Sequence, residues 1–199
     1  MRKALREIVQ IIILALIIFV VVQATMQTFD IKLRSMEPSL EAGERVVVNK
    51  AVYFHLSGAW AKLIPWASSE DGVSYLFHPP RRGEVIIFYP PNGSSLPYVK
   101  RIIGIPGDVI EIRKGRVYLN HSPTPLNEPY VAFVSHDTIR PVTVPKGHYF
   151  VMGDNRANST DSRSGWMVSY DKVVGKVWFT IWPPSRWGGA PNYSWEPSG

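Results

Sequence analysis

The chain has 199 residues and a formal net charge of +6, with 45% hydrophobic and 19% charged residues. This balance excludes a disordered chain, and the length suits one folded domain with an anchor or tail. The absence of cysteine excludes disulfides, thiolate metal sites and cysteine-protease chemistry.

The amino-terminal segment is strongly apolar. Residues 11–22 form an uninterrupted apolar run, which neighbouring residues extend from Ile8 to Met26. As a helix, Ile8 to Met26 would rise roughly 28 Å, enough to cross a hydrocarbon core of about 30 Å. Three basic residues precede it (Arg2, Lys3 and Arg6), so the positive-inside rule predicts a cytoplasmic amino terminus and an extracytoplasmic domain.

The same segment has other interpretations. It could be a cleavable export signal, because Val22 and Ala24 offer a site for cleavage, and the chain could cut itself after Ala24. A buried core helix is the weaker alternative, since nothing else in the chain has comparable hydrophobicity.

The rest of the chain predicts β structure. From Phe29 onward, short apolar runs alternate with turn residues, and no long stretch has helical periodicity. Lys114-Gly115 is a short hairpin signal. The expected strands are Arg45 to Asn49, Glu84 to Phe88, Tyr98 to Ile103, Val109 to Arg113, Arg116 to Leu119, His148 to Met152 and Lys172 to Ile181.

Two regions are less regular. Ala51 to Pro80 is rich in aromatic residues, which predict either ordinary core or a flap at the membrane interface (Tyr53, Phe54, Trp60, Trp66, Tyr75 and Phe77). The carboxy-terminal tail, rich in Trp, Pro and Gly, is expected to be surface-bound or mobile. We therefore predict three parts: an anchor over 1–29, one domain over 30–185 and a tail over 186–199.

The sequence restricts the chemistry. It contains no HExxH, no G-x-S-x-G, no P-loop and no G-x-G-x-x-G. The five histidines lack ligand spacing, so no metal and no cofactor is expected. The charge is too diffuse to predict nucleic-acid binding, although a mildly basic face favours an anionic membrane surface. Serine chemistry with a lysine base remains, because burial can lower a lysine pKa enough to give a neutral amine.

Three segments in order resemble the bacterial type I signal peptidases, the S26 peptidase family. Residues Arg34 to Leu40 (RSMEPSL) are similar to the family's S-M-x-P-T-L box, and Lys100 to Asp108 (KRIIGIPGD) to its K-R-x-x-G-x-P-G-D box. Gly153 to Arg163 (GDNRANSTDSR) is similar to G-D-N-R-x-x-S-x-D-S-R. Arg82 to Phe88 gives a weaker match to an R-G-D-V strand. The resemblance implies a mostly β domain, an antiparallel sheet forming a partly open barrel, behind one transmembrane helix.

The resemblance also implies roles. Ser35 corresponds to the nucleophile and Lys100 to the general base, acting through an acyl-enzyme. Ser159 matches the serine that hydrogen-bonds to the lysine and orients it. Asp161 and Arg163 match an ion pair that shapes the floor of the site. Read singly, a turn serine, a strand lysine and such an ion pair are ordinary surface features, so the expectation depends on the boxes together.

One position departs from the pattern. Some relatives have a serine two residues before the nucleophile that helps stabilise the oxyanion, whereas this chain has Leu33. The backbone N–H of Ser35 is then the expected oxyanion donor. Ser39 for Thr and Glu84 for Asp are milder changes.

The implied substrate is the signal peptide of an exported preprotein, bound as an added strand with small side chains beside the cut. The walls of its pockets are expected to include Phe29, Ile31, Leu33 and Tyr98. A membrane anchor would raise the effective concentration of substrates that share the same bilayer.

Alternatives remain open at this stage. A specialised processing peptidase would share the chemistry. A self-cleaving Ser–Lys repressor is disfavoured by the anchor and by the lack of a helix-turn-helix pattern. A membrane-anchored β module that only binds peptides would tolerate loss of the dyad, and Leu33 slightly favours it.

Overall fold

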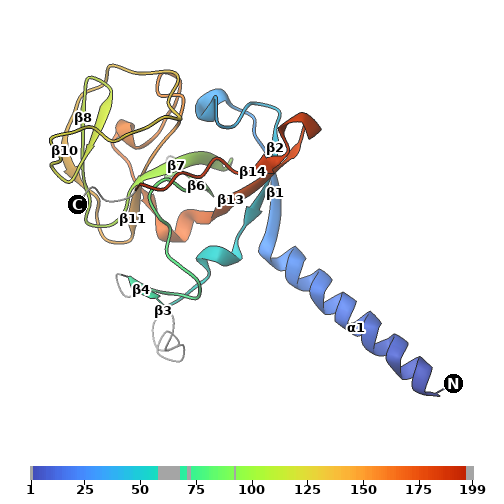
Figure 1. Cartoon of the computed structure of the whole chain (residues 1–199). Helices are drawn as coiled ribbons and strands as arrows, with labels where there is room; N and C mark the ends of the chain where they lie inside the picture. Colours follow the sequence, from blue (N-terminus) through green and yellow to red (C-terminus); the bar gives the residue numbers. More distant parts are fainter. Residues whose placement is uncertain (1, 58–67, 71–72, 92, 196–199) are drawn as a thin grey trace.

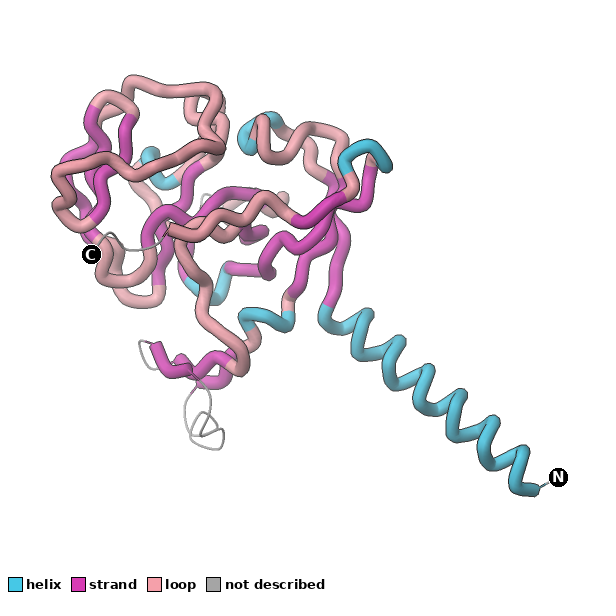
Figure 2. The backbone as a smooth tube through the Cα atoms, in the orientation of Figure 1, coloured by secondary structure: helices cyan, strands magenta, loops and turns pink. Residues whose placement is uncertain are grey.

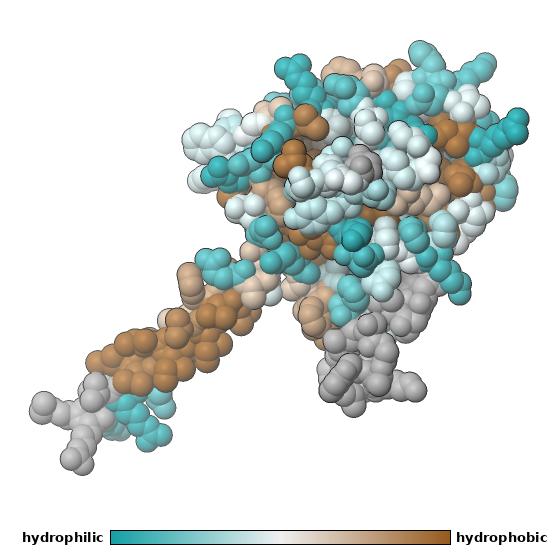
Figure 3. Space-filling view, turned by 180° about the vertical axis from the view of Figure 1, so that it is seen from behind, coloured by the Kyte–Doolittle hydropathy of each residue, from teal (hydrophilic) through white to brown (hydrophobic). Residues whose placement is uncertain are grey.

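The computed structural model describes residues 2–57, 68–70, 73–91 and 93–195. Helix α1 (Arg2–Thr25) extends away from the remainder of the molecule (Figure 1). Its apolar side chains are exposed, as illustrated by Ile11 at 67% (Figure 3). The stretch from Arg6 to Thr25 is long and apolar enough to cross a membrane.

Helix α1 continues directly into strand β1 (Met26–Asp30), without an intervening loop. Met26, which we expected to be the last residue of the helix, instead pairs with Asn49 in the sheet. The Lys50 N–H donates to the Thr25 carbonyl at 2.8 Å, which fastens the junction. The sheet therefore begins at Met26, and the expected boundary at residue 29 lies inside β1.

The main sheet is antiparallel and follows the order β1-β2-β13-β6-β7-β11-β12, with β14 beside β13. Figure 2 draws the strands in magenta. The mostly β fold class is confirmed. The strands after β1 are β2 (Arg45–Asn49), β6 (Val85–Phe88), β7 (Tyr98–Gly104), β11 (His148–Met152), β12 (Val168–Ser169), β13 (Val173–Trp182) and β14 (Gly188–Gly189). The sheet curls, because β1 and β7 stand four places apart in this order and still line one cavity. The curled sheet is the partly open barrel that the sequence led us to expect.

Two smaller sheets flank the main one (Figure 1). One contains β8 (Val109–Arg113), β9 (Arg116–Leu119) and β10 (Ile139–Thr143), and the other contains β3 (His55–Ser57), β4 (Ser68–Glu70) and β5 (Val73–Tyr75). The predicted hairpin is present: Lys114 and Gly115 both have positive φ, at 49° and 79°, as a two-residue turn of the primed type requires. In the described part of the chain, the 3₁₀ turns are η1 (Arg34–Met36), η2 (Ala51–Tyr53), η4 (Ser162–Ser164), η5 (Tyr170–Lys172) and η6 (Pro184–Arg186).

All seven strands expected from the sequence are present, within one residue at each end. The main difference is Glu84, which precedes β6 and turns its carboxylate inward. There it accepts hydrogen bonds from the Tyr53 hydroxyl at 2.6 Å and from Lys176 Nζ at 2.7 Å. Strands β1, β3, β4, β5, β10, β12 and β14 were not predicted.

The aromatic residues of the 51–80 region divide between core and surface. Tyr53 and Tyr75 are buried, whereas Phe54 and Phe77 are 52% and 60% exposed. Trp60 and Trp66 lie outside the described residues, so the question of a membrane-facing flap stays a prediction.

The tail, as far as it is described, is bound along the domain. Strand β14 pairs with β13, and the Tyr193 N–H donates to the Gly83 carbonyl at 3.0 Å. Asn192 bridges two strands, since its Oδ1 accepts from the Val85 N–H and its Nδ2 donates to the Val177 carbonyl. Residues 186–195 therefore pack as part of the domain.

Candidate active site

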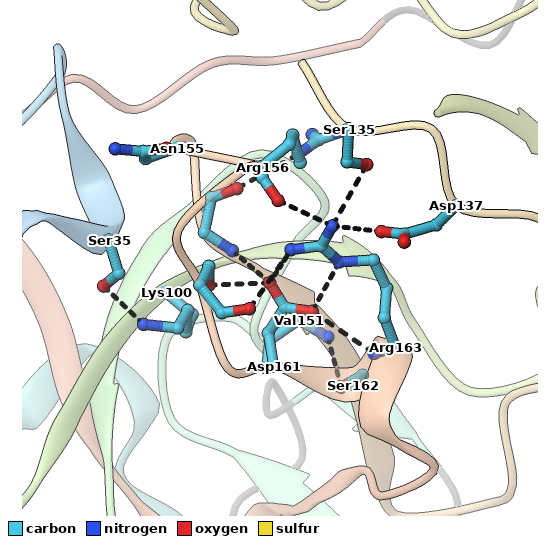
Figure 4. Close-up of polar contacts among 12 residues, drawn as sticks. Ser35, Lys100, Ser135, Asp137, Val151, Asn155, Arg156, Asp161, Ser162 and Arg163 are labelled. Carbon is cyan, nitrogen blue, oxygen red and sulfur yellow. Dashed lines mark hydrogen bonds and ion pairs between the residues drawn. The ribbon is translucent and has the colours of Figure 1, made fainter. Parts of the chain in front are cut away.

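The centre of the site is a contact between Ser35 in η1 and Lys100 in β7. Lys100 Nζ lies 2.6 Å from Ser35 Oγ, and the two side chains point toward each other (Figure 4). Both residues are buried, Ser35 at 7% and Lys100 at 3% exposure. Residues 65 positions apart in the sequence are thus joined by one short hydrogen bond.

Local packing explains why Ser35 sits where it does. Met36 and Leu40 are fully buried in the cluster that fills one side of the sheet, so the chain that follows the serine is held in place. The Asn155 N–H donates to the Ser35 carbonyl at 3.1 Å. Gly153 lies against the same carbonyl, because a Cβ there would approach Ser35 O to 2.4 Å and Ser159 Oγ to 2.3 Å. Only glycine fits this close approach.

Burial changes the chemistry of Lys100. Loss of hydration, the largest cause, lowers the pKa of its amine to about 8. The negative charges of Asp161 and Asp154 act in the other direction and raise the pKa. Half of the amine is therefore neutral near pH 8, while the ordinary ammonium of an exposed lysine stays charged there. The Val99 carbonyl accepts a further hydrogen bond from Nζ at 2.9 Å.

Asp161 and Arg163 form a two-pronged ion pair in the 153–163 loop. Arg163 Nε donates to Asp161 Oδ1 at 2.8 Å, and Nη2 donates to Oδ2 at 2.9 Å. Burial alone would raise the pKa of Asp161, but the hydrogen bonds and charge of Arg163 hold it below the usual value. Because Asp161 is fully buried, the pair differs from the solvated surface pair that is common in proteins.

Ser159 does not bond to the lysine directly. Its hydroxyl donates to Asp161 Oδ2 at 2.7 Å, and within the described part of the chain it makes no hydrogen bond to Lys100. The sequence led us to expect a direct contact with the amine. In this structure the connection runs through the carboxylate of Asp161, whose charge raises the pKa of Lys100.

A cavity of about 770 Å³ opens beside the dyad, between β1 and the segment that leads into Lys100. All four residues expected in its walls line it, together with Ser35 and Lys100. They are Phe29, Ile31, Leu33 and Tyr98.

Sequence reasoning missed other residues of the cavity wall, among them Ile87, Leu96, Asn158 and Thr160. Ile87 could have been found, because it belongs to a predicted strand. Asn158 and Thr160 lie in the 153–163 loop, and no periodicity indicates which way their side chains point.

A second buried ion pair lies behind the dyad. Arg101 follows Lys100 on β7 and donates to both oxygens of Asp154, at 2.9 and 2.6 Å. Both side chains are fully buried. No separate role was predicted for Arg101, which the sequence shows only as one residue of its box.

Known proteins of similar sequence belong to one family. The sequence profile of the family described as "Signal peptidase, peptidase S26" matches residues 4–182. The chain is 35% identical over 171 residues to a probable signal peptidase I-1 from Synechocystis sp., covering 82% of this chain and 75% of that protein. It is 31% identical over 216 residues to signal peptidase IB from Staphylococcus aureus, covering 99% of this chain and 97% of that protein.

A crystal structure of a signal peptidase I from Enterococcus faecalis V583 is also similar, with a TM-score of 0.44 and 32% identity, covering 50% of this chain and 97% of that one. The family profile spans most of the chain, and the two relatives align over most of their own length. The chain therefore belongs to the S26 signal peptidase family, whose signal peptidase I members remove signal peptides.

Proposed function

We propose that this chain is a membrane-anchored serine endopeptidase that removes signal peptides from exported preproteins through a Ser35–Lys100 dyad. The observation that carries the proposal is the 2.6 Å contact between Ser35 Oγ and the buried amine of Lys100. A neutral amine at that distance can accept the hydroxyl proton, which makes the serine oxygen a nucleophile.

In the first step, Ser35 Oγ attacks the carbonyl carbon of the scissile bond while Lys100 takes the hydroxyl proton. The negative charge that develops on the carbonyl oxygen is stabilised by the backbone N–H of Ser35. Leu33, exposed by 66%, brings no polar group to this task. The lysine then gives its proton to the leaving amine, the C–N bond breaks and an acyl-enzyme remains.

In the second step, neutral Lys100 takes a proton from water, and the hydroxide oxygen attacks the ester carbonyl. The serine regains its proton as the ester bond breaks, and the signal peptide leaves with a new carboxylate. Asp161, held by Arg163 and Ser159, fixes a negative charge near the lysine through both steps.

The substrate would lie in the cavity as an extended strand, between β1 and residues 96–99. Backbone hydrogen bonds would supply affinity, and the apolar walls at Phe29, Ile31, Leu33 and Tyr98 would select small side chains beside the cut. The proposal involves no metal, cofactor or nucleic acid.

Helix α1 would span the membrane with its amino terminus in the cytoplasm. Arg2, Lys3 and Arg6 lie at that end, as the positive-inside rule requires. The domain and the tail would then lie on the extracytoplasmic side, beside the preproteins that emerge there.

The test is cleavage of a preprotein with a standard signal peptide in a detergent–lipid mixture. Wild type, Ser35→Ala and Lys100→Ala are compared, with thermal unfolding used to verify that the variants fold. Cleavage after a small residue by wild type alone supports the proposal. Equal cleavage by Ser35→Ala would overturn it, and an inert but folded wild type that no serine-reactive lactam labels would favour a binding module.

A further inference from the structure

The loop between β9 and β10, residues 120–138, lies outside the substrate cavity but contacts two arginines of the 153–163 loop. Glu128 accepts hydrogen bonds from both Nη1 and Nη2 of Arg156, the first at 3.1 Å. Asp137 accepts from Arg163 Nη1 at 2.6 Å (Figure 4). The Arg156 side chain is 1% exposed and that of Glu128 is 9% exposed, so the first contact is a buried ion pair.

Tyr130 connects this contact to the second buried ion pair. Its ring centroid lies 4.0 Å from Cζ of Arg101, and its hydroxyl donates to Glu128 Oε1 at 2.8 Å. Burial, then the charge of Glu128, raises the pKa of the Tyr130 hydroxyl, so it keeps the proton that it donates. Tyr193 and Trp195 of the tail pack edge-on against the same ring, at centroid distances of 5.7 and 6.1 Å.

Five residues therefore form a closed ring of contacts, which we call the buried ring: Asp154, Arg101, Tyr130, Glu128 and Arg156. The ring closes through the backbone, where the Arg156 N–H donates to the Asp154 carbonyl at 3.1 Å. Within it, each arginine faces one carboxylate, and the tyrosine links the two ion pairs. Such an arrangement balances charge where water cannot do so.

The buried ring is connected to both halves of the dyad through neighbouring residues of the chain. Arg101 follows Lys100 on β7, so the two side chains point to opposite faces of the sheet. The Arg101 side chain points to the buried ring and the Lys100 side chain points to Ser35. On the other side, Asp154 and Arg156 flank Asn155, whose N–H supports the Ser35 carbonyl at 3.1 Å. A shift in the ring would move the serine and the lysine relative to each other.

We infer that Glu128 and Tyr130 are positioning residues, which set the distance between Ser35 and Lys100 through Arg156 and Arg101. The inference rests on the proposed function. Neither residue lines the substrate cavity, so their effect falls on the chemical step and not on substrate binding. A displacement of about 1 Å in a reacting group can cost on the order of 100-fold in rate.

The experiment uses the full chain in detergent–lipid mixture and the variants Tyr130→Leu and Glu128→Gln. We expect kcat to fall by roughly 10- to 100-fold while KM stays within about 2-fold. Rates are expressed per active site, titrated with a serine-reactive lactam, at a temperature well below the unfolding midpoint of each variant. A purely structural role would lower that midpoint and leave kcat per titrated site unchanged.

The chain offers matched controls on its surface. Tyr118 stacks on Arg113 with a centroid distance of 4.4 Å, and Glu111 accepts two hydrogen bonds from the same exposed guanidinium. Tyr118→Leu and Glu111→Gln remove the same chemistry away from the dyad. They are expected to leave kcat within about 2-fold of wild type.

Milder variants keep the proposal open to refutation if the first pair fails to fold. Tyr130→Phe keeps the aromatic ring over Arg101 and loses only the hydroxyl, so its kcat should lie between those of wild type and Tyr130→Leu. Glu128→Asp should recover part of the rate lost in Glu128→Gln. The inference is overturned if the folded Tyr130 and Glu128 variants match the surface controls. Failure of the proposed function looks different, because wild type would then be inert or Ser35→Ala active in the same assay.

Discussion

The protonation of Lys100 decides when the proposed dyad works. Since burial lowers the pKa of this amine to about 8, the neutral base is the minor form below that pH and the major form above it. We expect kcat/KM to rise with pH through about 8, and to be about 100-fold lower at pH 6 than on the plateau. A pH–rate profile with a short peptide substrate measures this, and a flat profile between pH 6 and 9 would exclude Lys100 as the base.

A charge variant tests the same assignment. The charge of Asp161 raises the pKa of Lys100, whereas that of Arg163 lowers it. Asp161→Asn removes the negative charge of Asp161 and leaves the positive charge of Arg163, so the rising limb of the pH–rate profile should move to lower pH. Movement to higher pH would contradict the electrostatic account, whatever the loss in overall rate.

Leu33 is the second residue at which a single change is informative. It precedes η1 and lines the cavity next to Ser35, where a serine hydroxyl could donate to the oxyanion. We expect Leu33→Ser to raise kcat by about 10-fold or more, because one such donor contributes about 10²–10³ in rate elsewhere. Lys32→Ser, one residue earlier in the same wall, is the control. An unchanged kcat in Leu33→Ser would show that the hydroxyl cannot reach the oxygen.

At the scale of elements, the tail tests whether residues beyond β13 belong to the fold. A Cβ at Gly83 would come within 1.6 Å of the Tyr193 carbonyl oxygen, so Gly83→Ala must displace the tail. Gly107→Ala is the matched control, since its φ of 87° resembles the 85° of Gly83 but no atom lies within 4 Å. We expect the free energy of unfolding to fall by at least about 2 kcal/mol more in Gly83→Ala. Equal losses in chemical denaturation would mean that the tail contributes little.

Strands with strong local signals were predictable from the sequence. Val109–Arg113 and Arg116–Leu119 are short, mostly apolar runs on either side of the turn residues Lys114-Gly115, and the structure has them at the expected residues. Strand β1 was missed because its five residues continue an apolar helix and only pairing with β2 makes them a strand. Strand β14 consists of two glycines, so only its contact with β13 defines it.

The residues of the site also divide into those that the sequence predicts and those that it does not. The boxes singled out Ser35 and Lys100, and the walls near them follow from strand neighbours. Glu128 and Tyr130 belong to a loop without periodicity, and their contacts with Arg156 and Arg101 join residues 28 and 29 positions away in the chain. Such contacts depend on tertiary packing, which a single sequence does not encode in any local pattern.

At the scale of the whole molecule, the junction between α1 and β1 joins the anchor to the site. Inserting Gly-Ser-Gly-Ser between Thr25 and Met26 would make that connection flexible and break the hydrogen bond from Lys50. We expect cleavage of a membrane-inserted preprotein to fall by about 10-fold or more, and cleavage of a short soluble peptide to stay within about 2-fold. The same insertion between Lys3 and Ala4 is the control. Equal loss on both substrates would point to damage to the domain instead.

On the proposed function, the same junction would make bilayer thickness part of substrate choice. The stretch from Arg6 to Thr25 is about 30 Å long, so in a thin bilayer it must tilt. Because β1 follows the helix with no residue between them, that tilt would be passed to the cavity, and Ser35 would change its height above the lipid headgroups. Lipids with shorter acyl chains would then move the cut along the same preprotein, with no change in any residue of the cavity.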